Sequence, residues 1–155
     1  MVSGEWSVVS GQITPRSIGT RRGTVSVRTY RDLIVWQKAM ELAKVVYRIA
    51  GHLPVAERFG LASQLRRAAV SVPSNIAEGQ ARRHSAEFRQ FLYQALGSLA
   101  ELDTQLTLAS ELGYLAAGET DQALALIEEL RKMAHTLVLR LPERRSLNRA
   151  LTTNH

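Results

Sequence analysis

The chain of 155 residues carries 20 Lys and Arg against 14 Asp and Glu, and it contains no cysteine. The length suits one domain of ordinary size. The lack of cysteine excludes a disulfide framework, Cys-ligated zinc, iron–sulfur clusters and thiol catalysis. Few aromatic residues and many Leu and Ala favour helices over a β sandwich or barrel.

No apolar run approaches the roughly 20 residues that a membrane-spanning helix needs. The first residues, MVSGEWSVVSGQ, combine neither a basic start nor a continuous apolar stretch, so they do not have the pattern of a secretory signal. These observations predict a cytoplasmic protein.

Charge is distributed unevenly along the chain. Residues 1–28 hold four Arg and one Glu, and residues 142–155 hold three Arg and one Glu. Residues 58–89 sum to +4, whereas residues 90–130 sum to −7 and contain no Lys or Arg. A basic isoelectric point is a reason to consider nucleic acid as a partner, but much of the excess lies in the two ends.

The first 28 residues are rich in Ser, Thr, Gly and Arg, and they show no lasting apolar period. Val25 and Val27 alternate as in a strand, but an isolated strand has nothing to pair with. The composition predicts a disordered N-terminal arm over 1–28 and a flexible C-terminal tail over 142–155. The folded domain is then expected over 29–141.

Apolar residues at spacings of three and four predict four helices in the domain. The first begins at Asp32 and ends before Gly51 and Pro54. Its apolar residues form two neighbouring rows, a wider face than one packing seam requires, which predicts self-association. The second begins near Val55 or Ala56, is interrupted by a proline, and ends or weakens at Gly79.

The third helix has Ser85 as its expected N-cap and is closed by Gly113. The fourth begins near Thr120 and is stopped by Pro142. Four two-faced helices with short connections predict an all-α fold, an antiparallel up-down-up-down four-helix bundle.

A polar row runs along the second predicted helix at spacings of three and four, made by Gln64, Arg67, Ser71, Asn75 and Glu78. Such a row can meet a partner or a neighbouring subunit. It can equally be a solvated face with an internal Arg67–Glu78 network. The sequence leaves both interpretations open.

Arginines are concentrated over residues 58–89. The candidates for contacts to nucleic-acid phosphates are Arg66, Arg67, Arg82, Arg83 and Arg89. Forked guanidinium donors suit phosphate oxygens. The alternative is charge balance against the acidic 90–130 stretch, within the bundle or between subunits. Little aromatic interleaving accompanies the arginines, so sequence-specific reading of bases is not expected.

Metal and catalytic motifs are lacking. No Glu-x-x-His pair of the di-metal bundle type occurs, and the four histidines are scattered. The phosphate-binding, nucleophile-elbow and zinc-protease motifs are also missing. We therefore expect a non-catalytic protein with no metal and no cofactor. Trp36 and Tyr47 are interpreted as packing residues rather than a ligand-stacking pair.

Four stretches carry a family resemblance: YRDLIVWQKA over 30–39, FGLASQLRRA over 59–68, SVPSNIAEG over 71–79 and FLYQALGSLAE over 91–101. They resemble the 23S rRNA intervening-sequence family, and the resemblance covers about residues 29–141. The accessory variability determinant proteins of diversity-generating retroelements, which partner a reverse transcriptase, are similar in fold.

The resemblance implies a four-helix bundle that assembles as a ring-like homopentamer, with no established enzymatic activity. Its motif residues, which are candidates for an interface, are Gln64, Arg67, Ser71, Pro73, Asn75, Glu78, Gly79, Gly97, Ser98 and Glu101. The expected function is a non-catalytic oligomeric bundle that binds RNA or another nucleic acid through phosphate contacts. The alternative is a scaffold or adaptor for a protein partner, such as a reverse transcriptase, without direct nucleic-acid binding.

Overall fold

The computed structural model describes residues 6–9, 12–15, 25–82 and 84–142. Four long helices dominate it, and the prediction of four helices is confirmed. Their bounds are α1 Ile34–His52, α2 Leu61–Ala81, α3 Ser85–Glu111 and α4 Asp121–Arg140. None of the helices in the described ranges is both long enough and apolar enough to cross a membrane.

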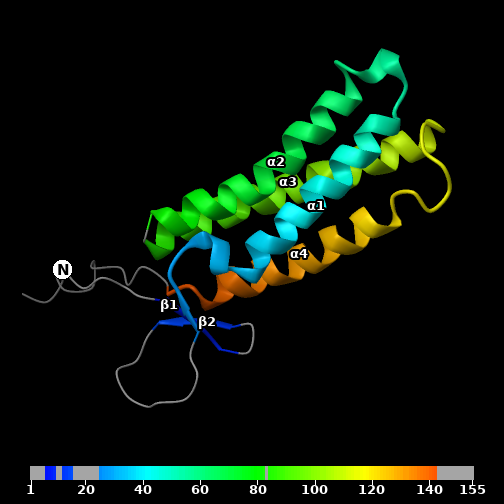
Figure 1. Ribbon diagram of the computed structural model, residues 1–155. Coiled ribbons are helices and arrows are strands. Elements are labelled where there is room, and N and C mark those ends of the chain that lie inside the picture. Colours follow the sequence, from blue (N-terminus) through cyan, green and yellow to red (C-terminus); the bar gives the residue numbers. More distant parts are fainter. Residues whose placement is uncertain (1–5, 10–11, 16–24, 83, 143–155) are drawn as a thin grey trace, which may run out of the picture.

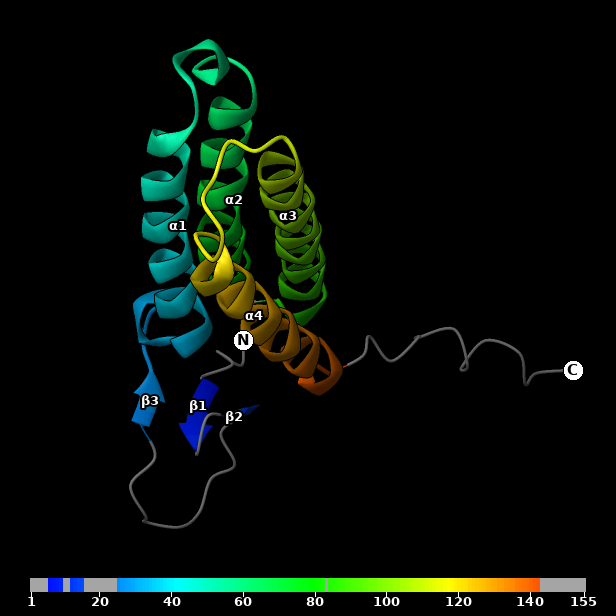
Figure 2. The ribbon, with the colours of Figure 1, turned by 90° about the vertical axis from the view of Figure 1, so that its right-hand side faces the viewer.

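The helices are bundled lengthwise, with the connections at their ends (Figure 1). The α1–α2 and α3–α4 connections lie at one end, and the short α2–α3 connection lies at the other. The most extensive packing joins α2 to α3 and then α1 to α2. The last helix, α4, runs obliquely relative to the other three (Figure 2).

The core of the bundle is built mainly from leucine. Fully buried large side chains come from all four helices, and they include Leu42, Leu65, Leu92, Leu99, Leu102, Leu106, Ile127 and Leu130. Both apolar rows of α1 contribute to it, because Val35, Ala39, Leu42, Ala43, Val46 and Ile49 are all buried within one chain. In the neighbouring row Trp36 and Met40 are only partly buried and Tyr47 is 47% exposed, so the bundle itself covers most of the wide face of α1 but not all of it.

Three helix starts differ from the predicted ones. The first helix begins at Ile34 rather than Asp32, because residues 30–32 form a separate 3₁₀ turn, and it runs past Gly51 to His52. The second helix begins at Leu61, because residues 55–57 form a separate 3₁₀ turn. Glu57 Oε2 accepts a hydrogen bond of 2.9 Å from the Leu61 N–H, so a carboxylate caps α2 from the preceding connection. Ser85 is the first helical residue of α3 rather than its N-cap.

A small sheet accompanies the bundle and corrects part of the predicted N-terminal arm. Its strands are β1 Trp6–Val9, β2 Gln12–Pro15 and β3 Val25–Val27, in the order β2-β1-β3, and both pairings are antiparallel. The strand-like alternation at Val25 and Val27 thus finds a partner in β1, at the register Trp6 opposite Val27. The sequence did not reveal it because strands of three or four residues show almost no period. The remaining residues of the predicted arm, and 143–155 of the predicted tail, lie outside the described residues.

The chain enters α1 through a capped 3₁₀ turn, Tyr30–Asp32. The Asp32 carboxylate accepts hydrogen bonds from the N–H groups of Thr29 and Arg28, which hold the pKa of Asp32 below its ordinary value. The ring of Tyr30 meets Trp36 edge-on at 5.3 Å between centroids. Trp36 thus packs at the start of α1 against Tyr30.

Candidate functional site

The five arginines proposed as phosphate contacts do not form one cluster. Arg66 and Arg67 lie in the first third of α2, whereas Arg82 directly follows its last turn and Arg89 lies in the first turns of α3. Arg83 lies outside the described residues. The predicted basic surface is therefore divided between the first turns of α2 and the α2–α3 end of the bundle.

Arg82 and Arg89 are engaged by the fold itself. Arg82 Nη2 donates to Glu78 Oε1 at 2.8 Å, which raises the pKa of the guanidinium above its usual range. Arg89 Nη2 donates to the carbonyl oxygen of Leu141 at 2.6 Å and so ties the start of α3 to the end of α4. Since Glu78 pairs with Arg82, the Arg67–Glu78 network considered for the polar row is not the one that forms.

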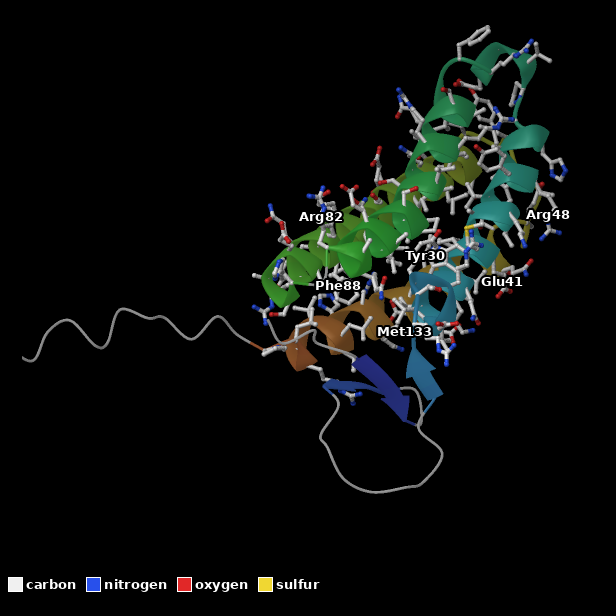
Figure 3. All side chains as sticks on the ribbon, turned by 60° about the vertical axis from the view of Figure 1, so that its left-hand side comes forward. Tyr30, Glu41, Arg48, Arg82, Phe88 and Met133 are labelled. Carbon is white, nitrogen blue, oxygen red and sulfur yellow. The ribbon has the colours of Figure 1, made fainter. Side chains whose placement is uncertain are left out.

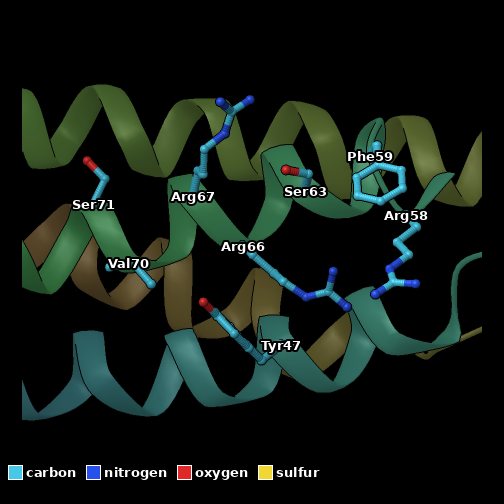
Figure 4. A pocket seen from close by; sticks show the side chains of 8 residues that line it. All are labelled: Tyr47, Arg58, Phe59, Ser63, Arg66, Arg67, Val70 and Ser71. Carbon is cyan, nitrogen blue, oxygen red and sulfur yellow. The ribbon is translucent and has the colours of Figure 1, made fainter.

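Arg66 and Arg67 border a groove between α1 and α2, with a volume of about 600 Å³ (Figure 4). Its lining residues are Tyr47, Arg58, Phe59, Ser63, Arg66, Arg67, Val70 and Ser71. Three of the eight are arginines and none is an acid. The groove is thus a concentrated site of positive charge, although it lies on a bundle whose central portion is nearly neutral.

Aromatic rings accompany two of these arginines. The guanidinium carbon of Arg66 lies 5.9 Å from the centroid of the Tyr47 ring, and that of Arg58 lies 5.4 Å from the centroid of Phe59. Both distances are within the range of cation–π attraction. Figure 4 shows Arg58 and Arg66 extending toward the gap above α1, with Arg67 extending from the opposite side of α2. The cations therefore lie on both edges of the groove.

The rest of the polar row faces α3. The hydroxyls of Ser71 and Ser98 are hydrogen-bonded at 2.8 Å, and Asn75 Nδ2 donates at 2.9 Å to both the hydroxyl and the carbonyl oxygen of Ser71. Ser98 Oγ in turn donates to the Gln94 carbonyl at 3.2 Å. Four of the motif residues proposed as an interface are therefore used inside one chain. Ser71, Asn75 and Ser98 form hydrogen bonds, and Pro73 is buried. We name the contact made by Ser71, Asn75 and Ser98 the polar seam.

A second polar contact joins the same two helices nearer the connection that carries Phe59. Gln105 is 6% exposed, and its Nε2 donates to Glu101 Oε1 at 3.1 Å and approaches Gln64 Oε1 at 3.5 Å. Gln105 Oε1 is buried and has no partner within the described part of the chain. Gln64 and Glu101 are exposed, so these two motif residues remain accessible at the surface.

The two motif glycines have opposite surroundings. Gly79 is buried, and a Cβ atom there would lie 2.7 Å from Phe91 Cβ and 2.9 Å from Phe88 Cδ2. At Gly79 the backbone of α2 lies close to α3, where Figure 3 labels Phe88, and α2 continues past Gly79 to Ala81. Gly97 is exposed, with nothing within 4 Å of a Cβ.

The sequence did not single out Tyr47, Arg58 and Phe59 as parts of one site. The signal available in the sequence was Phe59, an aromatic residue directly beside the cation Arg58. Across the described ranges, no three Asp, Glu or His side chains are gathered closely enough to hold a metal ion.

The model of the 23S rRNA-intervening sequence protein family matches residues 31–136 of this chain. The chain belongs to that family. The family resemblance carried by the four sequence stretches is thereby confirmed. Among curated proteins, no match was found.

A solved structure supports the fold of this intervening-sequence protein. It is a protein of unknown function from the S23 ribosomal protein family of Bacteroides thetaiotaomicron, with 21% identity and a TM-score of 0.64. The match covers 68% of this chain and 96% of that one. At this identity the likeness concerns the fold alone.

Proposed function

We propose that this intervening-sequence protein is a non-catalytic oligomeric helical bundle that binds RNA through its phosphates, and that the α1–α2 groove is the binding site. The observation that carries the proposal is that Arg58, Arg66 and Arg67 all line one groove, and that this lining contains no carboxylate. Guanidinium groups donate forked hydrogen bonds to phosphate oxygens, and release of counterions from RNA adds to the affinity.

The contacts of the arginines reduce the five candidates for phosphate binding to a smaller set. Arg82 and Arg89 already donate from Nη2 to Glu78 and to the Leu141 carbonyl, so the fold uses part of their donor capacity, and the Glu78 carboxylate offsets the charge of Arg82. Arg66 lies over the face of the Tyr47 ring, and both Arg66 and Arg67 line the groove. The groove arginines are therefore the ones to test.

The oligomer is proposed as a ring-like homopentamer of antiparallel up-down-up-down bundles. Alternation of the connections between the two ends of the bundle supports the antiparallel order. Large apolar side chains left exposed on α3 and α4 support association, namely Tyr93, Leu108, Leu112 and Leu139. Sedimentation or light scattering should give five times the 17.2 kDa of one chain. A particle of one chain mass would contradict this part of the proposal.

The salt dependence of RNA affinity tests the binding site. For the unaltered protein, the logarithm of affinity should fall linearly with the logarithm of salt concentration between roughly 50 and 200 mM. Replacing Arg58, Arg66 and Arg67 together by Ala should lower the steepness of this line by about 2, because each phosphate contact on a single strand accounts for about 0.7. Anisotropy of a labelled oligonucleotide measures both quantities.

The matched control removes the same charge elsewhere. Arg48, Arg131 and Arg140 are exposed and lie on α1 and α4 away from the groove. Their triple replacement by Ala should leave the salt dependence nearly unchanged. Equal losses in the two triple variants would mean that only total charge matters. An absence of binding at low salt would contradict the RNA proposal altogether.

The second candidate function is a scaffold for a protein partner. The outer surface of α3 favours it, because Tyr93 and Leu108 are about half exposed and Gly97 offers a close approach between them. Partners captured from a lysate that persist after nuclease treatment, and that are lost when Tyr93 and Leu108 become Ser, would support the scaffold. Partners that disappear with nuclease would favour RNA.

A further inference from the structure

The α1–α2 groove contains more exposed aromatic surface than phosphate binding requires. Phe59 is 88% exposed, and Tyr47 and Val70 are 47% and 44% exposed. All three line the groove together with the arginines. Because contacts to phosphates alone need no ring, the aromatic surface calls for a ligand that has a flat apolar face as well as negative charge.

Each ring in the groove is paired with a guanidinium. Arg58 lies over Phe59 at the connection, and Arg66 lies over Tyr47 on α1. Unpaired nucleobases stack both on aromatic rings and on the planes of arginine side chains. The rings of Phe59 and Tyr47 offer stacking surfaces, and the three arginines offer donors to phosphates. All of them line one groove (Figure 4).

We propose that the groove takes an unstacked nucleotide of single-stranded RNA, with its base on the Phe59–Arg58 surface and its flanking phosphates on Arg66 and Arg67. This inference rests on the proposed RNA-binding function and specifies its ligand. In an A-form duplex the base faces are occupied by neighbouring bases, so a duplex can offer the groove only its phosphates. The site therefore selects single strands without reading their sequence, since every base has a π-face.

A second copy of the chain is the competing occupant of this surface. The charged side chains of the groove are all cations, and its other polar side-chain groups are the hydroxyls of Tyr47, Ser63 and Ser71, a set that suits a ligand with many anionic acceptor oxygens. A polynucleotide meets this requirement along its whole length. The test below separates the two occupants.

The experiment compares three ligands of about 12 nucleotides, within the usual site sizes of single-strand binders. They are a single-stranded RNA, the same RNA annealed to its complement, and an abasic ribose-phosphate strand of equal charge. The unaltered full-length protein should bind the first about tenfold more tightly than the other two. Phe59→Ala should remove most of that preference while leaving affinity for the abasic strand unchanged, and Phe59→Trp should restore it.

Ile34→Ala is the control, because Ile34 is an apolar residue that is 43% exposed at the start of α1 and lies outside the groove. It should leave the preference unchanged. Equal affinity for all three ligands would overturn the stacking inference and leave phosphate binding standing, whereas no affinity for any of them would end both proposals. If Phe59→Ala instead lowered the mass of the particle without changing the preference, the groove would be a contact between copies and the inference would be wrong.

Discussion

The two sides of α2 make different use of one unusual stretch of sequence. The side toward α3 carries small and neutral polar residues, and there Ser71, Asn75 and Gly79 are bonded or packed against α3. Arg66 extends toward α1 and Arg67 extends from the opposite side of α2, and both border an open groove (Figure 4). Within one stretch of α2, some residues thus stabilise the fold and others remain available to a ligand.

The comparison shows which motif residues a functional assay should leave alone. Changes in the polar seam or at Gly79 should affect stability first, and any loss of binding would follow from unfolding. Changes in the groove should affect binding and leave stability nearly unchanged, because surface substitutions away from packed features cost about 0.5 kcal/mol or less. The three predictions below test this division.

The largest effect is expected at Gly79. Gly79→Ala should lower the free energy of unfolding by about 1–3 kcal/mol, since the new methyl group would overlap the Cβ of Phe91 and the ring of Phe88. The overlap exceeds the gain in helix propensity, because the Cβ of Phe91 cannot move without its helix. Urea unfolding followed by circular dichroism measures the change.

Gly97→Ala is the matched control on α3. Nothing lies within 4 Å of a Cβ there, so the free energy of unfolding should rise by up to about 1 kcal/mol through helix propensity alone. A loss of stability at this position would place Gly97 against another copy of the chain. No loss at Gly79 would remove the basis for assigning the α3 side of α2 to the fold.

A smaller effect is expected at Ser98. Ser98→Ala should cost about 1 kcal/mol of unfolding free energy, because it removes the hydrogen bond between the Ser71 and Ser98 hydroxyls and leaves Ser71 bonded only to Asn75 of its own helix. Ser63→Ala, a serine of α2 that lines the groove, should change stability by less than about 0.5 kcal/mol. Equal effects at the two serines would mean that the seam does not contribute more than the groove.

The smallest effect concerns the end of the bundle that carries Phe59. His52 contacts Glu119 there and joins the end of α1 to the α3–α4 connection. A hydrogen bond with His52, and then the Ala116 N–H, holds the pKa of the Glu119 carboxyl below its ordinary value. A lowered folded-state pKa gives stability that is present above about pH 4.5 and lost as the pH falls below it.

Replacing His52 by Ala should therefore reduce the loss of stability between neutral pH and pH 3. Thermal unfolding of the two proteins across that range measures the difference, and most of it should arise below about pH 4.5. RNA affinity at neutral pH should be nearly unchanged, because neither residue lines the groove. Parallel acid-stability curves would show that the contact contributes nothing.

The spacing of the apolar residues, together with the residues that end helices, was enough to predict four helices that pack as a bundle. Leucines at spacings of three and four identify the buried faces, and Gly113 and Pro142 follow the ends of α3 and α4 closely. The predicted start of α2 near Val55 was wrong, because residues 55–60 are compatible with a helix as far as the local sequence shows. The cap that Glu57 provides at Leu61 appears only in three dimensions.

The candidate site was predicted only in part. Two of its cations, Arg66 and Arg67, were selected from local charge, but that selection also included Arg82 and Arg89, which the fold uses. Tyr47 and Phe59 lie twelve positions apart in sequence and on different elements, so no local pattern associates them. The three-stranded sheet was missed because its strands of three or four residues show almost no period, and because the pairing of β1 with β3 joins segments far apart in the chain.

By itself, the sequence determined that four two-faced helices form and which side of each is apolar, because period and chain-breaking residues act within a few positions. Only the tertiary structure decided which polar residues of α2 are used inside the bundle and which stay available. That choice depends on where α1 and α3 lie against α2, and the distance between helices is set by side chains such as Phe88 and Phe91 that approach Gly79 from another part of the chain.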